Sequence, residues 1–333
     1  MKNKILITGA DGFIGSHLVE YLVNNGYSVK ALTLYNSFNS WGCLDLVDEA
    51  IKREVEVIQG DIRDFESVKN AMKNCKIVIN LAALISIPYS YEAPESYIDT
   101  NVKGTFNILK AAKDSGKIKV IHTSTSEVYG TAQHIPIKEN HPLVAQSPYA
   151  ATKICADQMA GSFYSSYNLP VMILRPFNTF GPRQSLRAII PTIISQFLTQ
   201  EKKLKMGNLS PKRNFNYIKD TIAAFEMACK SNHFRGEVIN VGSKFEISIK
   251  DTIKLVSDVM DKKLKISSEK ERKRPVNSEV FRLVASNLKA KKILGWKPQY
   301  DTKSTFKNAL QETVDWYSDS ENLEKFKSNL YNL

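Results

Sequence analysis

The fold is decided by residues 4–16, which read Lys-Ile-Leu-Ile-Thr-Gly-Ala-Asp-Gly-Phe-Ile-Gly-Ser. The apolar run at 5–7 is short and rich in isoleucine, which is typical of a buried strand. Glycines follow at positions 9, 12 and 15, and apolar residues then return at helical spacing between His17 and Val23. A strand, a glycine-rich turn and a helix in this order predict the first unit of a parallel α/β sheet.

The glycine-rich turn has the composition of an anion-binding loop. The first glycine allows a tight turn, the second lets a phosphate approach the backbone, and the third lets the helix pack closely on the strand. The first N–H groups of the helix are then available to a pyrophosphate, so we predict a dinucleotide site. Its predicted contacts in this stretch are Gly9, Asp11, Gly12, Phe13, Ile14 and Gly15.

Further short apolar runs repeat the first one along the chain. Helical segments separate most of these runs, and such alternation is typical of right-handed β-α-β units with helices on both faces of a parallel sheet. The predicted fold class is therefore α/β, with a Rossmann-type doubly wound parallel sheet. The further predicted strands lie at residues 29–32, 55–58, 77–81, 120–123, 171–174 and 238–241.

The alternation stops after Arg175, where prolines mark irregular chain as far as residue 211. A helix at 218–230 and the strand at 238–241 then restore it. We therefore predict a discontinuous cofactor-binding domain and a smaller C-terminal substrate-binding α/β domain. The predicted cofactor-binding domain comprises residues 1–178 with 217–262, and the predicted substrate-binding cap comprises 179–216 with 263–333.

Other cofactor contacts are predicted at the carboxyl ends of the strands, where ligands bind in such sheets. The second strand lacks the usual acidic residue for the ribose, and the neutral residues Tyr35 and Asn36 stand there instead. Residues 33–45 contain no Arg or Lys for a 2′-phosphate, so the sequence favours NAD and leaves NADP open. The remaining predicted contacts are Asp61, Ile62, Leu81, Ala82, Ala83 and Asn101.

The composition is that of an ordinary globular protein, with 43% hydrophobic and 24% charged residues among 333. The net charge of +12 is concentrated at residues 262–292, where eleven Lys or Arg stand against three Glu. We interpret this segment as a solvated face that also receives a phosphate-bearing small substrate. No aromatic and glycine string of the RNA-binding kind is present, so no nucleic-acid partner is expected.

Membrane and metal sites are not predicted. No run approaches the roughly 18 apolar residues of a membrane helix, and the first residues show no signal-peptide core, so we expect a cytoplasmic protein without a membrane partner. The four cysteines lie far apart with no Cys or His at metal-ligand spacing, so neither disulfides nor a metal site are expected.

Two strings carry candidate catalytic groups. Residues 124–130 follow the fifth predicted strand, and Tyr149 and Lys153 open a helix, where their spacing puts them on one face. An ammonium beside a phenol lowers the phenol pKa and makes it usable as a base. Thr125 is predicted to hydrogen-bond the same sugar hydroxyl. A Tyr-Lys pair at this spacing is common on helix surfaces, but its place beside the glycine loop and Thr125 favours catalysis.

With these motifs the chain resembles the extended short-chain dehydrogenases/reductases, the NAD-dependent epimerase/dehydratase family, over nearly its whole length. The resemblance implies NAD(P) as cofactor, Tyr149 as base and Lys153 on the nicotinamide ribose. It also implies a nucleotide-sugar substrate, whose diphosphate pairs with arginines. The matching pieces are residues 9–15, 61–62, 81–83, 125–130, 149–153, 175–178, 181–182, 213–215, 274–275 and 278–279. The substrate-binding candidates are Asn178, Arg187, Arg213, Arg274 and Glu279.

Glu127 distinguishes between members of this family. The 4-epimerases usually carry a small residue there, whereas Thr125-Ser126-Glu127 resembles the string of GDP-mannose dehydratases. UDP-glucuronate decarboxylases also show it, so an epimerase or a decarboxylase remains an alternative. Residues 35–42, 274–280 and 294–296 most resemble the nucleotide-activated N-acetylglucosamine 4,6-dehydratases of the legionaminic acid pathway, with either GDP or UDP as the nucleotide.

The resemblance assigns roles to the candidate catalytic residues Thr125, Ser126, Glu127, Tyr149 and Lys153. In a dehydratase Tyr149 takes the carbon-4 hydroxyl proton as hydride leaves, and Glu127 takes the carbon-5 proton that the new ketone acidifies. Ser126 stands where dTDP-glucose dehydratases have Asp, so the donor to the departing 6-hydroxyl stays open. A non-catalytic dinucleotide sensor is the alternative from another class, and the intact catalytic set argues against it.

A homodimer is also predicted. The helical segments at 97–112 and 149–165 each present a second apolar stripe beyond the one that the sheet uses. The family resemblance implies that these helices form the interface between two copies.

Overall fold

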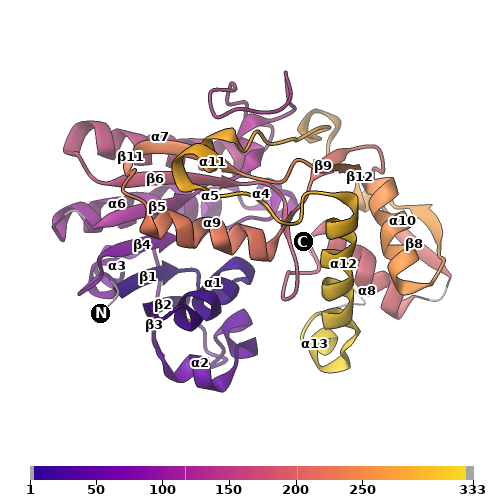
Figure 1. The fold of residues 1–333 in the computed structure, drawn as a ribbon, viewed down its shortest axis with the longest axis horizontal. Coiled ribbons are helices and arrows are strands. Elements are labelled where there is room, and N and C mark those ends of the chain that lie inside the picture. Colours follow the sequence, from indigo (N-terminus) through magenta and orange to yellow (C-terminus); the bar gives the residue numbers. More distant parts are fainter. Residues whose placement is uncertain (1–3, 117, 201, 328–333) are drawn as a thin grey trace.

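A seven-stranded parallel sheet lies at the centre of the computed structural model, which describes residues 4–116, 118–200 and 202–327 (Figure 1). Each predicted strand overlaps one strand of this sheet, so the Rossmann-type fold is confirmed. The predicted domain ranges also include residues 1–3, 117, 201 and 328–333, which lie outside the described residues. In spatial order the strands are β3 (Val55–Gly60), β2 (Ser28–Leu34), β1 (Lys4–Thr8), β4 (Ile77–Asn80), β5 (Lys119–Thr123), β6 (Val171–Pro176) and β11 (Arg235–Val241).

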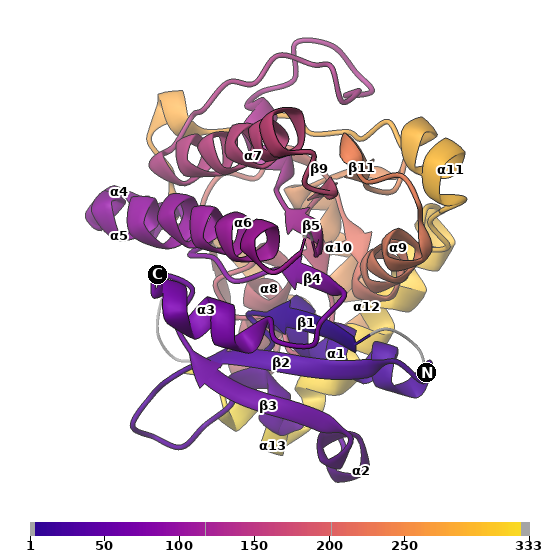
Figure 2. The same ribbon diagram turned by 90° about the vertical axis from the view of Figure 1, so that its left-hand side faces the viewer.

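The strand order reverses between β1 and β4, and this reversal opens the crevice in which sheets of this kind bind ligands. Helices cover both faces of the sheet (Figure 2). One face carries α3 (Phe65–Ala71), α6 (Gly104–Asp114) and α7 (Pro148–Tyr167). The other carries α1 (Phe13–Asn24) and α9 (Ile218–Lys230), whose bounds match the predicted helix at 218–230.

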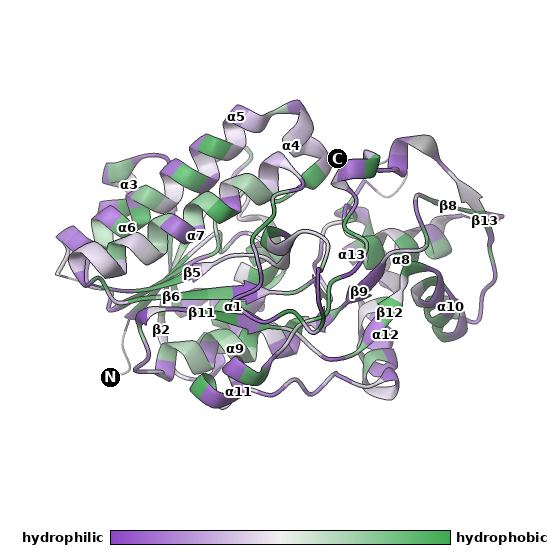
Figure 3. Cartoon of the chain, turned by 90° about the horizontal axis from the view of Figure 1, so that it is seen from above, coloured by the Kyte–Doolittle hydropathy of each residue, from purple (hydrophilic) through white to green (hydrophobic). Residues whose placement is uncertain are grey.

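The sheet is buried on both faces because its side chains alternate. Ile5 and Ile7 of β1 belong to the core cluster that contains Leu18 of α1, whereas Leu6 belongs to the cluster that contains Ile108 of α6. None of these five side chains is exposed to solvent. Near-continuous apolar strands of this kind are typical of a parallel sheet between two helix layers. Figure 3 shows the same feature as green strands β6 and β11 between helices that carry purple residues outward.

A smaller group of elements lies beyond the carboxyl ends of the strands (Figure 1). Its helices α8 (Ile189–Thr199), α10 (Ile249–Met260) and α12 (Lys303–Ser318) pack on one another. The prediction assigned α10 to the cofactor-binding domain, but its contacts with α8 and α12 place it in this group. The strand pairs of the group are β7 (Thr179–Phe180) with β10 (Asn216–Tyr217), β8 (Lys203–Met206) with β13 (Lys265–Ser268), and β9 (Lys212–Asn214) with β12 (Glu246–Ser248).

The remaining elements are short. The helix α11 (Leu288–Leu294) follows the cap strands in the chain, yet it packs on β11 and α9 of the sheet domain rather than in the predicted cap. Among the helices of the described residues, none is long and apolar enough to cross a membrane. The other short elements are η1 (Gly42–Leu46), α2 (Glu49–Arg53), α4 (Ile87–Glu92), α5 (Pro94–Tyr97), η2 (Ile98–Lys103), η3 (Ser126–Tyr129), η4 (Lys270–Arg272), η5 (Val276–Ser278) and α13 (Ser320–Glu324).

Candidate active site

The glycine loop forms a tight cradle at the start of α1. Gly9 has a φ of +66°, and a Cβ on Gly15 would lie 2.1 Å from the carbonyl oxygen of Gly9. The helix has Gly12 as its N-cap, with no side-chain cap and no acidic residue in its first turn. Its first N–H groups and the positive end of its dipole therefore face outward without a competing carboxylate, which fits a dinucleotide pyrophosphate.

Two polar side chains brace this cradle against neighbouring strands. The Thr8 hydroxyl donates to Asn80 Oδ1 at 2.8 Å and accepts from the Ala82 N–H at 3.2 Å. A carboxylate oxygen of Asp11 accepts from the Leu34 N–H at 3.1 Å, at the end of β2. Burial raises the pKa of Asp11, and the hydrogen bond from Leu34 opposes that rise. The glycine loop and the ends of β2 and β4 thus form one surface.

The two predicted ribose partners after β2 differ in how free their side chains are to bind the ribose. Tyr35 is 68% exposed. The Asn36 amide is engaged in its own loop, because its Nδ2 donates to the Ser40 carbonyl at 2.8 Å and its Oδ1 accepts from the Phe38 N–H at 3.1 Å. The sequence could not reveal this loop turn, which makes Asn36 a support for the loop.

The other predicted cofactor residues lie at the same edge of the sheet. Asp61, directly after β3, forms an ion pair with Arg63 at 2.5 Å, and Ile62 is buried against Gly104. Leu81, Ala82 and Ala83 directly follow β4. Asn101 is buried in η2 and braces the backbone, since its Oδ1 accepts from the Leu84 N–H at 2.9 Å and its Nδ2 donates to the Leu84 carbonyl at 3.0 Å.

Tyr149 and Lys153 lie on one face of the first turns of α7. This helix begins well because Ser147 is its N-cap, accepting from the Ala150 N–H at 3.1 Å, and Pro148 occupies its first turn. The Tyr149 ring is buried and packs edge-on against Tyr97, with ring centroids 6.3 Å apart. The Thr125 side chain hydrogen-bonds the Tyr149 hydroxyl.

The pKa of Tyr149 differs from the sequence prediction. Burial raises it well above the usual value for a phenol, the hydrogen bond with Thr125 lowers it, and the charge of Glu127 raises it again. We expected the Lys153 ammonium to bring this pKa down, but burial of the ring outweighs the opposing influences. Tyr149 is therefore a neutral phenol at physiological pH in the protein alone.

Lys153 carries a buried amine. Its Nζ donates to the Thr123 carbonyl at 2.6 Å, at the end of β5. Burial lowers the pKa of Lys153 to about 8, although the nearby charge of Asp157 works in the opposite direction. The contact fixes the amine at the edge of the sheet, and Lys153 stands one helical turn from Tyr149 along α7.

This pKa makes stability depend on pH in a testable way. Between pH 8 and 10.5 the folded protein has lost the Lys153 proton while an unfolded chain still holds it, so unfolding takes up a proton. We expect the free energy of unfolding to rise across this window, by at most about 1.4 kcal/mol per pH unit from this group. Denaturant titrations should show this contribution in wild type and lose it in Lys153→Met. Parallel pH profiles for both proteins would contradict it.

A buried polar network beneath Lys153 was not predicted from the sequence. Asp157 Oδ2 accepts from the Ser124 hydroxyl at 2.8 Å and from Arg175 Nε at 3.0 Å. Arg175 also donates to the Tyr129 hydroxyl at 2.8 Å. Burial alone would raise the pKa of Asp157, but His122 and Arg175 hold it below its usual value. The spacing of Asp157, four residues after Lys153, was the available signal for a polar helix face.

Glu127 lies close to both the catalytic tyrosine and the cap. Thr125 is the N-cap of η3 and accepts from the Glu127 N–H at 3.2 Å, which fixes the start of this turn. The Glu127 carboxylate is near enough to raise the pKa of Tyr149 and to counter the burial that lowers the pKa of Arg213. Ser126, by contrast, is only 2% exposed.

Three of the predicted substrate-binding residues lie near one another in the cap, and one of them, Arg213, lies near Glu127. Arg213 of β9 lies 3.4 Å from Glu279, and burial lowers the pKa of Arg213 while Glu127, Arg274 and Glu279 act on it as neighbouring charges. Arg274 Nη1 and Asn178 Nδ2 are buried with no hydrogen-bond partner in the described residues. Unpaired buried donors of this kind fit a polyanionic ligand such as a diphosphate.

Arg187 is the outlying member of the predicted set. It is exposed, and its Nε donates to the Ser185 hydroxyl at 3.2 Å. Its charge nevertheless reaches Tyr97, where it opposes the burial that raises the pKa of Tyr97 to about 12. Arg187 therefore stands at the rim of the site, on the side of the catalytic tyrosine. In the described residues no group of His, Cys, Asp and Glu is arranged to hold a metal ion.

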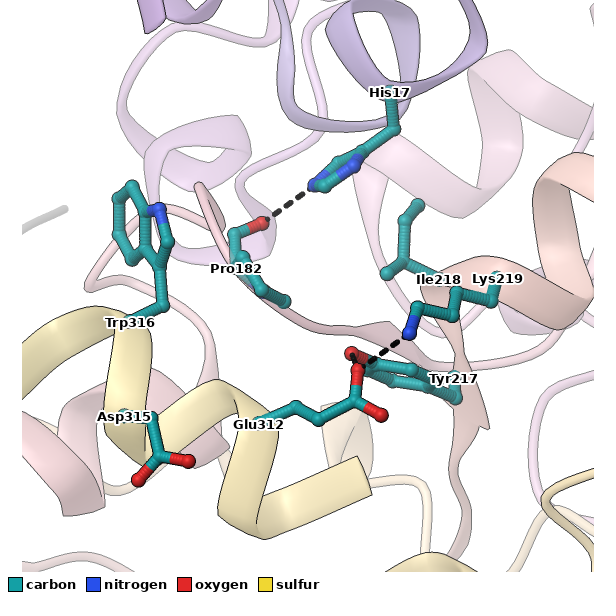
Figure 4. A pocket seen from close by; sticks show the side chains of 8 residues that line it. All are labelled: His17, Pro182, Tyr217, Ile218, Lys219, Glu312, Asp315 and Trp316. Atoms are coloured by element: carbon teal, nitrogen blue, oxygen red, sulfur yellow. Dashed lines mark hydrogen bonds and ion pairs between the residues drawn. The ribbon is translucent and has the colours of Figure 1, made fainter. Parts of the chain in front are cut away.

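A pocket of about 420 Å³ lies away from these residues, where α12 meets α1 and α9 (Figure 4). His17 contacts the Pro182 carbonyl at 2.9 Å, and Glu312 accepts from Tyr217 and Lys219, each at 2.7 Å. Burial, assisted by the charge of Arg183, lowers the pKa of His17 to about 4. These contacts join the cap to the sheet domain, and none of the predicted site residues lines the pocket.

Comparison with known proteins agrees with this geometry. The family model described as GDP-mannose 4,6 dehydratase matches residues 6–309. The low-salt glycan biosynthesis protein Agl12 of Haloferax volcanii is 33% identical over 94% of this chain and 98% of its own length. The human dTDP-D-glucose 4,6-dehydratase is 30% identical over 98% of this chain and 92% of its own length.

Solved structures include members with different reactions. The dTDP-glucose 4,6-dehydratase DesIV of Streptomyces venezuelae, with NAD bound, gives a TM-score of 0.85 at 26% identity, covering 96% of this chain and 98% of its own. The UDP-N-acetylglucosamine 4-epimerase of Methanobrevibacter ruminantium gives 0.84 at 30% identity, covering 95% and 99%.

Fold, site and matches together define the class of protein. The chain belongs to the NAD-dependent epimerase/dehydratase family of extended short-chain dehydrogenases/reductases. Within that family it falls among the nucleotide-sugar 4,6-dehydratases and 4-epimerases.

Proposed function

We propose that this protein is a nucleotide-sugar 4,6-dehydratase of the N-acetylglucosamine type, with GDP or UDP as the nucleotide. The observation that carries the proposal is the Glu127 carboxylate, which lies close enough to Tyr149 to raise the pKa of that phenol. Interconversion at carbon 4 requires one acid/base group, whereas removal of the carbon-5 proton requires a second. Glu127 is the second group.

NAD is the proposed cofactor, and it supplies the hydride acceptor and donor. The cradle of Gly9, Gly12 and Gly15 fits its pyrophosphate. The absence of Lys and Arg from residues 33–45, together with the Asp11 carboxylate at the end of β2, disfavours the extra phosphate of NADP. Lys153 is assigned to the nicotinamide ribose.

The residues of this chain then divide the proton transfers. Tyr149, oriented by Thr125, takes the proton of the carbon-4 hydroxyl in its ionised form, which positive charge around its hydroxyl in the loaded site would stabilise. Oxidation at carbon 4 makes a ketone that acidifies the proton on carbon 5. Glu127 takes that proton, and the 6-hydroxyl leaves as water. The sugar is reduced at carbon 6 and reprotonated at carbon 5, which gives a 4-keto-6-deoxy product with no net redox change.

The diphosphate is assigned to the buried donors of the cap. Arg213 and Arg274 present planar guanidinium groups that pair with two phosphate oxygens at once, a geometry that lysine does not reproduce. Asn178 Nδ2 lies buried without a partner and serves the same anion. Glu279 beside Arg213 limits how many anionic groups this part of the site accepts. Arg187 serves the open side of the site.

A 4-epimerase or UDP-glucuronate decarboxylase is the second candidate, because Ser126 favours it. In the dTDP-glucose dehydratases an acid stands at this position, whereas this chain has the hydroxyl of the buried residue Ser126 there. Neither alternative reaction has to protonate a departing 6-hydroxyl. The sensor alternative has no such support, since Thr125, Tyr149 and Lys153 form a complete catalytic set.

The mass of the product separates these functions. Purified protein should be incubated with UDP-GlcNAc, GDP-GlcNAc and UDP-glucuronate, and the products should be analysed by mass spectrometry. Loss of one water from an N-acetylglucosamine nucleotide supports the dehydratase. An unchanged mass with an inverted carbon 4 identifies an epimerase, and loss of carbon dioxide identifies a decarboxylase.

A homodimer is also proposed. On the helices predicted to form its interface, Ile98 is 54% exposed, Phe106 is 37% exposed and Tyr167 is 49% exposed. Phe106 and Phe163 pack edge-on at 6.1 Å, which links the apolar residues of α6 and α7 into one patch. We expect light scattering at micromolar concentration to give twice the chain mass, and Phe106→Glu to shift the protein towards monomer. A wild-type monomer would refute the interface.

A further inference from the structure

Gln146 lies where three of the chain segments that carry site residues meet. It directly precedes Ser147, the N-cap of the helix that carries Tyr149 and Lys153. Its Oε1 accepts from the Thr131 N–H at 2.5 Å, just after the turn that carries Glu127. Its Nε2 donates to the Asn277 carbonyl at 3.0 Å, in the segment between Arg274 and Glu279.

The orientation of this amide is fixed by its neighbours. A backbone N–H needs an acceptor, and the Asn277 carbonyl needs a donor, so exchanging the oxygen and nitrogen of Gln146 would put like groups together at both ends. The fit is also tight. Gly130 has a φ of +62°, and a Cβ there would lie 2.6 Å from the Val144 carbonyl oxygen and 2.8 Å from Gln146 Oε1, so only glycine fits beside this amide. The Gln146 amide thus joins two segments, with its oxygen as acceptor on one side and its nitrogen as donor on the other.

Residues 274–279, which we call the substrate segment, are attached to the sheet domain by few contacts. The Ser278 hydroxyl donates to the Gln146 carbonyl at 2.6 Å, so its oxygen accepts from the Tyr91 hydroxyl, which lies 2.5 Å away. The tip of the segment, Val276, is 82% exposed. Polar contacts rather than apolar packing therefore hold Arg274 and Glu279 over the site.

We propose that Gln146 is a positioning residue that sets the distance between the acid/base Glu127 and the diphosphate-binding substrate segment. It is assigned no contact with the reacting atoms or the cofactor, and it acts through the Thr131 N–H at one end and the Asn277 and Glu279 carbonyls at the other. Its acceptor end holds the Glu127 turn, and its donor end, with Ser278, holds Arg274 and Glu279. The acceptor end is expected to affect kcat, because it orients a proton-transfer group. The donor end is expected to affect KM, because it holds the segment that binds substrate.

Three variants separate the two ends. Ser278→Ala releases the substrate segment only, because it removes the hydrogen bonds to the Gln146 carbonyl and from the Tyr91 hydroxyl. The KM for the nucleotide sugar should therefore rise about five- to tenfold, with kcat nearly unchanged. Gln146→Glu keeps the acceptor for Thr131 but sets an oxygen against the Asn277 carbonyl, so it should raise KM and spare kcat. Gln146→Met keeps the length of the side chain and loses both ends, so it should raise KM and lower kcat together.

Controls distinguish positioning from a purely structural role. Gln133, which is exposed in the same loop, provides matched variants Gln133→Glu and Gln133→Met, and these should leave both parameters unchanged. The unfolding temperature and the NAD affinity of every variant, measured by calorimetry, should stay near wild type. The charge added by Gln146→Glu is controlled by Ser278→Ala, which adds none. Gln146→Met with Ser278→Ala should be less than additive on KM, since both release one segment.

The inference rests on the proposed function for its kinetic readout, and a binding readout keeps the two apart. If wild type turns over no nucleotide sugar, the proposed function fails, while calorimetric binding of UDP and GDP still tests the segment. There the Ser278→Ala and Gln146→Met variants should each bind the preferred diphosphate at least fivefold more weakly. Unchanged KM and diphosphate affinity in both variants would overturn the proposal. So would a general defect, in which the same variants also bind NAD more weakly and unfold at a lower temperature.

Discussion

Glu127→Gln is expected to oxidise the nucleotide sugar at carbon 4 and then stop. The amide keeps the shape and the hydrogen-bonding reach of the side chain but has no basicity, while Tyr149 and Lys153 are untouched. The carbon-5 proton therefore stays in place and the 6-hydroxyl is retained. Loss of a positioned general base costs about a hundredfold to ten-thousandfold in rate. Reduced nicotinamide should accumulate, visible by its absorbance, together with a 4-keto sugar that has lost no water.

A second carboxylate provides the control for this stall. Glu279→Gln changes a neighbouring acid beside Arg213, and it should alter KM without building up reduced nicotinamide. Substrate deuterated at carbon 5 should react more slowly in wild type if proton removal limits the rate. Near-normal dehydration by Glu127→Gln would show that Glu127 is not the base for the carbon-5 proton. Full 4-epimerase activity in wild type would refute the proposed dehydratase function.

Tyr149→Phe should abolish the first oxidation, again by about a hundredfold to ten-thousandfold, while the protein stays folded. The buried ring is replaced by one of nearly equal volume, so packing against Tyr97 is preserved. The variant should bind NAD and nucleotide sugar with wild-type affinity in calorimetry, yet show no nicotinamide absorbance on mixing. Because burial holds the Tyr149 phenol neutral in the protein alone, wild-type activity should also depend on the positive charges placed around that hydroxyl.

A tyrosine farther along the same helix tests the specificity of this loss. Tyr164 lies on α7, where its ring covers Gly236, and Tyr164→Phe should leave the oxidation rate within twofold of wild type. Appreciable reduced nicotinamide in Tyr149→Phe would show that another group takes the carbon-4 hydroxyl proton.

The sequence predicted the sheet well because its signals are local. Short isoleucine and valine runs, glycines at fixed spacing and a helix of clear period at 218–230 are each settled by neighbouring residues. The glycine loop, the Tyr149 and Lys153 pair and the string around Glu127 fall at strand ends or helix starts for the same reason. Parallel strands bring these ends to one edge, so their meeting followed from the fold class.

Features that depend on distant contacts were out of reach. The raised pKa of Tyr149 comes from burial that no spacing reveals. The helix α10 follows a sheet strand in the chain but packs with the cap. Gln146 carried no signal at all, because its partners Thr131 and Asn277 lie 15 and 131 residues away.

The path of the chain between its two groups of elements limits how the molecule can move. The backbone leaves the sheet after β6, returns at α9, leaves again after β11, returns at α11 and leaves once more for α12. Several chain connections of this kind oppose a rotation of the cap about a single hinge, because all of them would have to change conformation together. A bulky substrate is therefore expected to enter through small local movements of loosely attached segments at the rim of the site. The sheet domain and the cap are expected to keep their relative position.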